Sequence, residues 1–293
     1  MTGRLVLSAV LGPLCLAMAA ALPGAGAGAQ GPTFSARTET VRVDVSVIDR
    51  DRPVRGLTAA DFELLDNGVP QRIDFVGFED TPVSVMLALD MSGSVQGARL
   101  GQLRDAGARV TSSLRPGDRA GLISFSERVL IRSRLTSDIG TLVAALGQPA
   151  PAGDTALIDA AYAAMVAGAS DSGRPLVIVF SDGADTASFL APELVLDTAR
   201  RLGPAVYAVT TAGLDRGGFL DELVRLTGGR RLDATFDRLG ETFTTILDEF
   251  RLRYLLSYTP TGTTPGGWHE LTVRLRSRPG VEVRARPGYL GFR

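Results

Sequence analysis

Four short, continuous runs of apolar residues in the middle of the chain constrain its fold more than any other feature. They span residues 83–89, 120–125, 176–180 and 205–209. Runs without polar alternation are typical of strands buried on both faces, as in parallel sheets. Helical patterns separate them at 100–114, 139–146, 156–167 and 192–202, and another follows at 239–252. This order predicts an α/β domain over residues 82–252, with a doubly wound, mostly parallel sheet flanked by helices.

A different pattern lies on either side of this domain. Valine occupies every second position from Val41 to Val47, and similar alternation recurs at 271–275 and 281–285, which predicts half-buried strands. Asn67-Gly68, between the runs 62–66 and 69–75, predicts a β-hairpin, because Asn-Gly accepts the positive φ angles of a type I′ turn. Neither end is long enough to bury a core alone. We therefore expect residues 34–80 and 253–293 to form one small β-sandwich, into which the α/β domain is inserted.

The first 29 residues have the pattern of a signal peptide. Arg4 precedes an apolar stretch at 5–22, and the small residues at 25–29 offer cleavage sites. We expect an exported protein, periplasmic or secreted, with no membrane span after cleavage; an uncleaved membrane anchor is the alternative. Cleavage would remove Cys15, the single cysteine, and with it any disulfide or thiol chemistry.

Composition excludes several functions. The formal net charge of the 293 residues is −1, so no strong field favours nucleic acid as a partner. The sequence has no lysine, which excludes a Schiff base or a phosphate-loop lysine. A serine-histidine-aspartate triad could use only His269. One His and one Cys are too few ligands for a zinc site built from cysteine and histidine. We expect that the protein is not an enzyme.

Polar side chains follow the apolar runs at the points where a parallel sheet would place its ligand-binding edge. Asp90, Ser92 and Ser94 alternate after the first run, so their side chains can project to one side. Asp182 follows the third run, and Thr155 precedes a helical pattern. Their oxygens are hard ligands, suited to Mg²⁺, or to Mn²⁺ or Ca²⁺. The alternative is that Ser92 and Ser94 cap the next helix, and that Thr155 and Asp182 are cap or turn residues.

The segments LALDMSGSV, GDTALIDAAY and VIVFSDGAD, in this order, resemble the three metal-site loops of von Willebrand factor type A domains. In that family the site is called the metal-ion-dependent adhesion site. The resemblance implies that Ser92 and Ser94 bind the ion directly, that Thr155 binds it directly or through water, and that Asp90 and Asp182 act mostly through water. It also implies a short antiparallel edge strand, for which residues 129–134 are suited. The flanking segments resemble bacterial exported proteins that carry a related domain.

Three functions remain open from the sequence. The first is a metal-dependent protein-binding or adhesion module outside the cytoplasm, whose ion takes an Asp or Glu of a partner protein as its last ligand. The second is a structural envelope protein whose metal only stabilises the fold. The third is a Mg²⁺-dependent phosphohydrolase with Asp90 as nucleophile, although such chemistry usually needs a second carboxylate at position 92 and a lysine. The sequence does not indicate an oligomeric state.

Residues outside these motifs have mainly structural interpretations. His269 beside Trp268 is expected to pack at the sandwich edge, with a recognition pair on an exposed loop as the alternative. The arginines that alternate near the end of the chain are expected to form a solvated face; they are Arg274, Arg276, Arg278, Arg284 and Arg286. Asp118 is expected to be a turn residue.

Overall fold

The computed structural model describes residues 40–50, 52–79, 81–148, 150–169, 173–211, 218–278 and 280–291. The expected signal peptide at 1–29 lies outside these residues. All the described residues belong to one compact unit, Thr38–Arg293. Within the described ranges, every helix is too short or too polar to cross a membrane.

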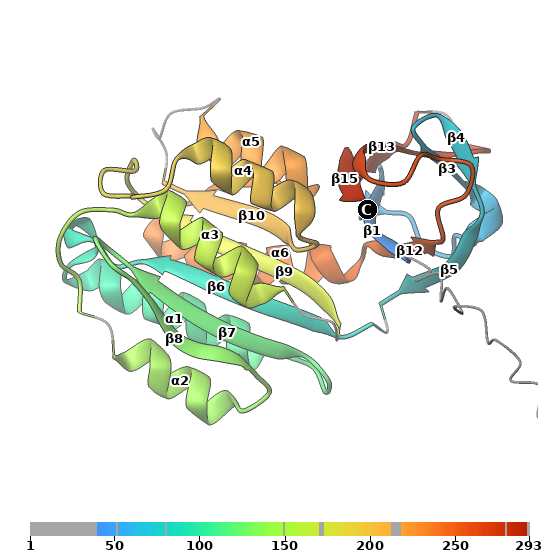
Figure 1. The fold of residues 1–293 in the computed structure, drawn as a ribbon. Helices are drawn as coiled ribbons and strands as arrows, with labels where there is room; N and C mark the ends of the chain where they lie inside the picture. The colour runs from blue at the N-terminus through green and yellow to red at the C-terminus, as the bar shows by residue number, and fades with distance from the viewer. Residues whose placement is uncertain are drawn as a thin grey trace, which may run out of the picture. The chain divides into compact units, whose positions relative to one another are not determined.

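A six-stranded central sheet contains all four predicted apolar runs (Figure 1). Its order is β11-β10-β9-β6-β7-β8. The strands are β6 (Val83–Asp90), β7 (Arg119–Phe125), β8 (Val129–Thr136), β9 (Arg174–Ser181), β10 (Ala205–Thr210) and β11 (Arg231–Asp233). Neighbours pair in parallel except β7 and β8, which are antiparallel. The carboxyl ends of β6 and β9 are therefore adjacent, which brings Asp90 and Asp182 to one edge.

Helices pack against both faces of this sheet (Figure 1). They are α1 (Ala98–Ser112), α2 (Ile139–Gly147), α3 (Leu157–Gly168), α4 (Pro192–Arg201), α5 (Phe219–Thr227) and α6 (Leu239–Arg251). Buried side chains of α1, α2 and α6 share one core cluster with the sheet, and those of α3, α4 and α5 share another. Five of these helices correspond to the predicted helical patterns. The sequence interpretation missed α5, which is only nine residues long and follows a glycine-rich stretch.

Strands from both ends of the chain form two further sheets, here called the flanking sheets. One has the order β14-β1-β12-β5, with β2 beside β1, and the other has the order β15-β13-β3-β4. The strands are β1 (Val41–Asp49), β2 (Arg52–Pro53), β3 (Phe62–Asp66), β4 (Val69–Gln71), β5 (Ile73–Phe78), β12 (Tyr254–Tyr258), β13 (Gly267–Leu275), β14 (Glu282–Arg284) and β15 (Gly288–Gly291). The alternating valines of β1 are buried in one cluster with residues of β12 and β13.

The second arm of the predicted hairpin differs from expectation. The turn at Asn67-Gly68 is present, since both residues have positive φ. However, the run 69–75 is divided between β4, which pairs with β3, and β5, which pairs with β12 in the other flanking sheet. Gln71 is the last residue of β4, before the chain passes to the other flanking sheet. Its side chain donates to the carbonyl of Thr261 at 2.9 Å and accepts from the Thr261 amide at 2.9 Å. These long-range contacts are not visible in a local pattern.

Buried arginines join the flanking sheets to the central sheet. Arg174, at the start of β9, is 1% exposed and donates from Nε to Oδ1 of Asp44 on β1 at 2.7 Å. Arg253 is fully buried and donates to the carbonyl of Gly228 at 2.8 Å. Their guanidinium groups also lie over the ring of Phe250, at 4.6 and 5.7 Å from its centroid. Charged groups at such depth require partners of this kind.

Candidate metal centre

Asp90 ends β6 with its carboxylate fully buried. Oδ1 accepts a hydrogen bond from the amide of Ser92 at 2.8 Å, and Oδ2 accepts one from the hydroxyl of Ser181 at 2.6 Å. Burial raises the pKa of Asp90 above its usual range, although both hydrogen bonds act in the opposite direction. The two hydrogen bonds thus fix the orientation of the carboxylate, and a nearby cation would favour its ionised form.

Ser92, Ser94 and Asp182 form a continuous row of oxygens at this edge. The hydroxyls of Ser92 and Ser94 are 3.0 Å apart, and Ser94 donates to Oδ1 of Asp182 at 2.7 Å. Ser92 precedes the single turn η2 (Gly93–Val95), but its side chain does not cap that turn. The capping alternative therefore does not account for the Ser92 side chain.

Backbone hydrogen bonds tie the three predicted loops together. The amide of Gly93 donates to the carbonyl of Gly153 at 3.0 Å, and the amides of Thr186 and Ala187 donate to the carbonyl of Thr155 at 2.9 and 3.1 Å. Thr155 is buried, and its Oγ1 lies 3.7 Å from the position that a Cβ on Gly183 would take. The loops of Asp90, Thr155 and Asp182 therefore meet at one edge, as the sequence predicted for these residues.

Arg99, at the start of α1, contacts the same row of oxygens. Its Nη1 lies 3.6 Å from Oδ2 of Asp182 and donates to the carbonyl of Ser94 at 3.0 Å. The guanidinium also lies over the ring of Phe236, 5.0 Å from the centroid. Half of the Arg99 side chain is exposed, so this cation can move away without disturbing the core.

The oxygens present fit a hard divalent cation. An octahedral Mg²⁺ with ligands at about 2.0–2.1 Å places neighbouring ligand oxygens about 3 Å apart. The Ser92–Ser94 and Ser94–Asp182 separations, 3.0 and 2.7 Å, are close to that spacing. Among the described residues no three His, Cys, Asp or Glu side chains come together. Any ion at this edge would consequently depend on hydroxyl oxygens as well as on the two carboxylates.

Two residues of this edge were missed by the sequence interpretation. Ser181 reaches Asp90 because β9 lies beside β6 with Leu89 opposite Phe180. Arg99 reaches Asp182 because α1 begins beside the serine loop. Knowing that β9 lies beside β6 would have indicated that Ser181 contacts Asp90, but the local sequence pattern does not reveal which strands are neighbours.

Other interpretations from the sequence have mixed outcomes. His269 is buried, as expected, and its Nδ1 lies 2.7 Å from Oδ1 of Asp66. The expectation of a solvated arginine face is wrong for Arg286, which is half-buried and donates from Nη2 to the carbonyl of Arg200. Burial lowers its pKa to about 10. Asp118 does more than close a turn, since it accepts from the amide of Val83 and forms a buried ion pair with Arg251.

One protein-family model matches the part of the chain that contains this edge. Residues 85–184 match the family model described as the von Willebrand factor type A domain. The matched span contains all five predicted site residues, namely Asp90, Ser92, Ser94, Thr155 and Asp182. Over this span the chain is therefore similar to von Willebrand factor type A domains. No curated protein matches the chain.

The structure aligns with several solved structures at low sequence identity. Proximal thread matrix protein 1 from the mussel byssus, in a form described as having a zinc-occupied MIDAS motif, aligns with a TM-score of 0.54 and 14% identity, over 64% of this chain and 50% of that one. Another structure of the mussel protein aligns with a TM-score of 0.53 and 14% identity, over 64% and 51%. An aerotolerance-related membrane protein from Bacteroides fragilis aligns with a TM-score of 0.46 and 18% identity, over 57% and 98%. The chain spans about half the length of the mussel protein.

Proposed function

We propose that this protein is a metal-dependent protein-binding module that works outside the cytoplasm. In the proposal, Ser92, Ser94 and Thr155 hold a divalent ion, Asp90 and Asp182 balance its charge, and an Asp or Glu of a partner protein completes its coordination. The observation that carries the proposal is the row of oxygens from Ser92 through Ser94 to Asp182, with spacings of 3.0 and 2.7 Å at one sheet edge.

The charges of the site support an anionic partner. Asp90 and Asp182 carry one negative charge each, and the other three oxygens are neutral hydroxyls. Mg²⁺ keeps several exchangeable ligand positions in sites that have only one or two carboxylates. An external carboxylate can therefore replace water at the ion. The zinc-occupied MIDAS motif of the mussel structure supports a divalent ion here, with Mg²⁺ as the first candidate and Mn²⁺ or Ca²⁺ as alternatives.

The arrangement of the chain in this proposal follows the sequence interpretation. We infer a doubly wound α/β domain over 82–252, inserted in a β-sandwich that the flanking sheets form from 34–80 and 253–293. The common core of β1, β12 and β13 supports the sandwich. A signal peptide at 1–29 would export the protein to the periplasm or the exterior, where such a module meets its partner.

Asp90 is poorly placed for the alternative of a phosphohydrolase. A nucleophilic carboxylate must present a lone pair to phosphorus. Asp90 is fully buried, and each of its oxygens already accepts a hydrogen bond. The remaining alternative is a structural envelope protein in which the ion only stabilises the fold.

The test is to measure whether a carboxylate and the ion bind together. Mg²⁺ is titrated into the protein calorimetrically in the presence of acetate, and separately of acetamide, which is similar in shape but neutral. Because coupling between two ligands is reciprocal, acetate should increase the apparent Mg²⁺ affinity while acetamide leaves it unchanged. If Mg²⁺ or Mn²⁺ binds and acetate has no effect with either ion, the binding proposal fails and the stabilising ion is favoured. The variant Ser92→Ala/Ser94→Ala is the control, since it should lose both effects.

A further inference from the structure

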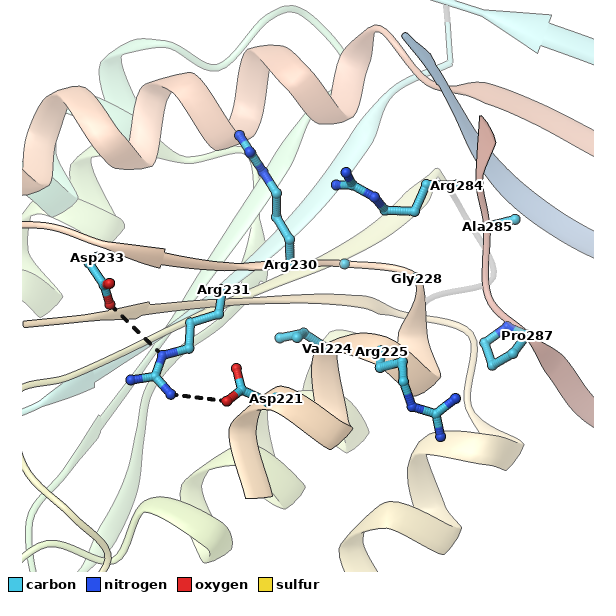
Figure 2. A pocket seen from close by; sticks show the side chains of 11 residues that line it. Asp221, Val224, Arg225, Gly228, Arg230, Arg231, Asp233, Arg284, Ala285 and Pro287 are labelled. Atoms are coloured by element: carbon cyan, nitrogen blue, oxygen red, sulfur yellow. Dashed lines mark hydrogen bonds and ion pairs between the residues drawn. The ribbon is translucent and has the colours of Figure 1, made fainter. Parts of the chain in front are cut away.

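A pocket of about 460 Å³ lies where α5 and β11 meet the segment around β14 (Figure 2). Its walls come from positions 221–233 and from positions 284–287, which are far apart in the sequence. The described residues that line it include none of the five candidate metal ligands. Its volume falls in the range of small-molecule sites, about 300–1,000 Å³.

Arginine dominates the lining of this pocket. Arg225, Arg230, Arg231 and Arg284 line it together with two carboxylates, Asp221 and Asp233. Figure 2 shows both carboxylates beside Arg231, and their oxygens lie 3.3 and 3.9 Å from its nitrogens. Arg225 is bound through two nitrogens to Glu222. The acidic groups of the lining are thus grouped around one arginine, at one end of the pocket.

Arg230 and Arg284 each contact a glutamate through one nitrogen, which leaves further N–H donors on each guanidinium. Arg230 pairs through Nη2 with Glu249 at 2.5 Å, and Arg284 pairs through Nη2 with Glu282. Neither glutamate lines the pocket, so each holds its arginine from outside. A guanidinium carries five N–H donors. The Nε of Arg230 is itself buried, so a ligand would meet the exposed part of this side chain, which is 41% exposed.

The wall between these arginines is rigid. Gly228 has a φ of 72°, and a Cβ on it would lie 2.7 Å from the amide nitrogen of Arg286. A Cβ on Gly229 would lie 1.8 Å from the carbonyl oxygen of Val206. The carbonyl of Gly228 is held by the buried Arg253 at 2.8 Å. A pocket with such walls is formed before a ligand arrives, which reduces the entropy lost on binding.

We propose that this pocket binds a phosphate monoester. Guanidinium groups pair with phosphate through several parallel N–H donors. Arg230 and Arg284 come from different segments, and a tetrahedral phosphate offers oxygens in different directions, whereas a carboxylate offers two in one plane. Val224, Ala285 and Pro287 supply apolar surface for the organic part of the ester. The site is independent of the metal centre, because it requires neither the ion nor its ligands.

The test uses phenyl phosphate and inorganic phosphate with the full chain, in EDTA so that no divalent ion takes part. Calorimetric titration should show saturable binding of phenyl phosphate at millimolar or lower concentration, and tighter than that of inorganic phosphate, because the ring contacts the apolar wall. Arg230→Gln and Arg284→Gln should each weaken binding about tenfold. Arg72→Gln, at an exposed arginine paired with Asp74, is the matched control and should leave affinity unchanged.

Three results would overturn the proposal. One is no saturable binding of phenyl phosphate up to about 10 mM, which corresponds to less than about 3 kcal/mol of binding free energy. Another is binding that both arginine variants retain while their circular dichroism and melting match the wild type. The third is equal loss in Arg72→Gln, which would indicate general charge attraction.

Discussion

Arg99 and Asp182 form an ion pair at the candidate metal centre, with Nη1 of Arg99 3.6 Å from Oδ2 of Asp182. The same nitrogen donates to the carbonyl of Ser94, so one cation contacts two of the three polar loops. A protein cation therefore neutralises part of the charge that a divalent ion would use. If the proposed ion binds, it competes with Arg99 for Asp182, and the affinity of the site for metal depends on how easily Arg99 moves away.

Removal of this arginine should strengthen metal binding. A positive charge several ångströms from a divalent ion repels it, and at a half-exposed position solvent reduces this repulsion. We expect Arg99→Gln to increase Mg²⁺ affinity about three- to tenfold by calorimetry. The control is Arg104→Gln on the same helix, whose guanidinium donates to the carbonyl of Gly147 instead. Unchanged or weaker Mg²⁺ binding in Arg99→Gln would show that Arg99 does not compete with the ion.

The pH dependence of metal affinity should reflect the burial of Asp90. Burial raises the pKa of its carboxyl in the metal-free protein, so protons compete with the ion at a higher pH than for an ordinary aspartate. Mg²⁺ affinity should therefore fall as the pH decreases from neutral toward about 4, the ordinary pKa of an aspartate, and the fall should begin above that value. The same raised pKa means that the ionised Asp90 destabilises the metal-free fold, so this contribution to stability improves as pH falls through the raised pKa. Titrations at several pH values test the first effect. A constant affinity throughout this range would contradict it.

The buried pair of Arg251 and Asp118 should contribute strongly to stability. Asp118 accepts from Nη2 of Arg251 at 2.6 Å and from the amides of Val83 and Arg115 at 2.7 and 2.9 Å. Asp118→Asn leaves a buried arginine without its charge partner, which should lower the free energy of unfolding by about 3–5 kcal/mol. Urea denaturation measures the change. Asp248→Asn is the control, because Asp248 contacts the same arginine from an exposed position and should cost less than about 1 kcal/mol. Equal effects of the two variants would refute the argument.

Asp66 should anchor the flanking sheets. Its buried carboxylate accepts from the hydroxyls of Tyr258 and Tyr289 at 2.7 and 2.9 Å, and it lies 2.7 Å from Nδ1 of His269. Tyr258→Phe removes one donor and keeps the ring, so unfolding free energy should fall by about 1–3 kcal/mol. Tyr162→Phe, on α3, is the comparison variant and should change stability little. A Tyr258→Phe protein as stable as the wild type in urea would mean that the remaining donors satisfy Asp66.

The sequence predicted the parts of this molecule that depend on local pattern. Continuous apolar runs predicted β6, β7, β9 and β10, and polar residues at strand ends predicted which loops gather at the edge. The predictions that were wrong or missing depend on contacts between residues far apart in the sequence. The chain changes sheets after Gln71, whose side chain is hydrogen-bonded to Thr261. Arg286 is half-buried and bonded to the carbonyl of Arg200, although its neighbours alternate as on a solvated face. Ser181 and Arg99 likewise reach the candidate metal centre through strand order and helix placement.

The most direct test of the central claim is calorimetric titration of Mg²⁺ into the protein and into Ser92→Ala/Ser94→Ala, with Mn²⁺ as a second ion. Both hydroxyls are removed in the variant while Asp90 and Asp182 remain. The account predicts saturable binding to one site in the wild type and loss of that binding in a variant that keeps its circular dichroism spectrum. Binding of equal affinity in the folded variant, or none in the wild type even with acetate present, would contradict the account.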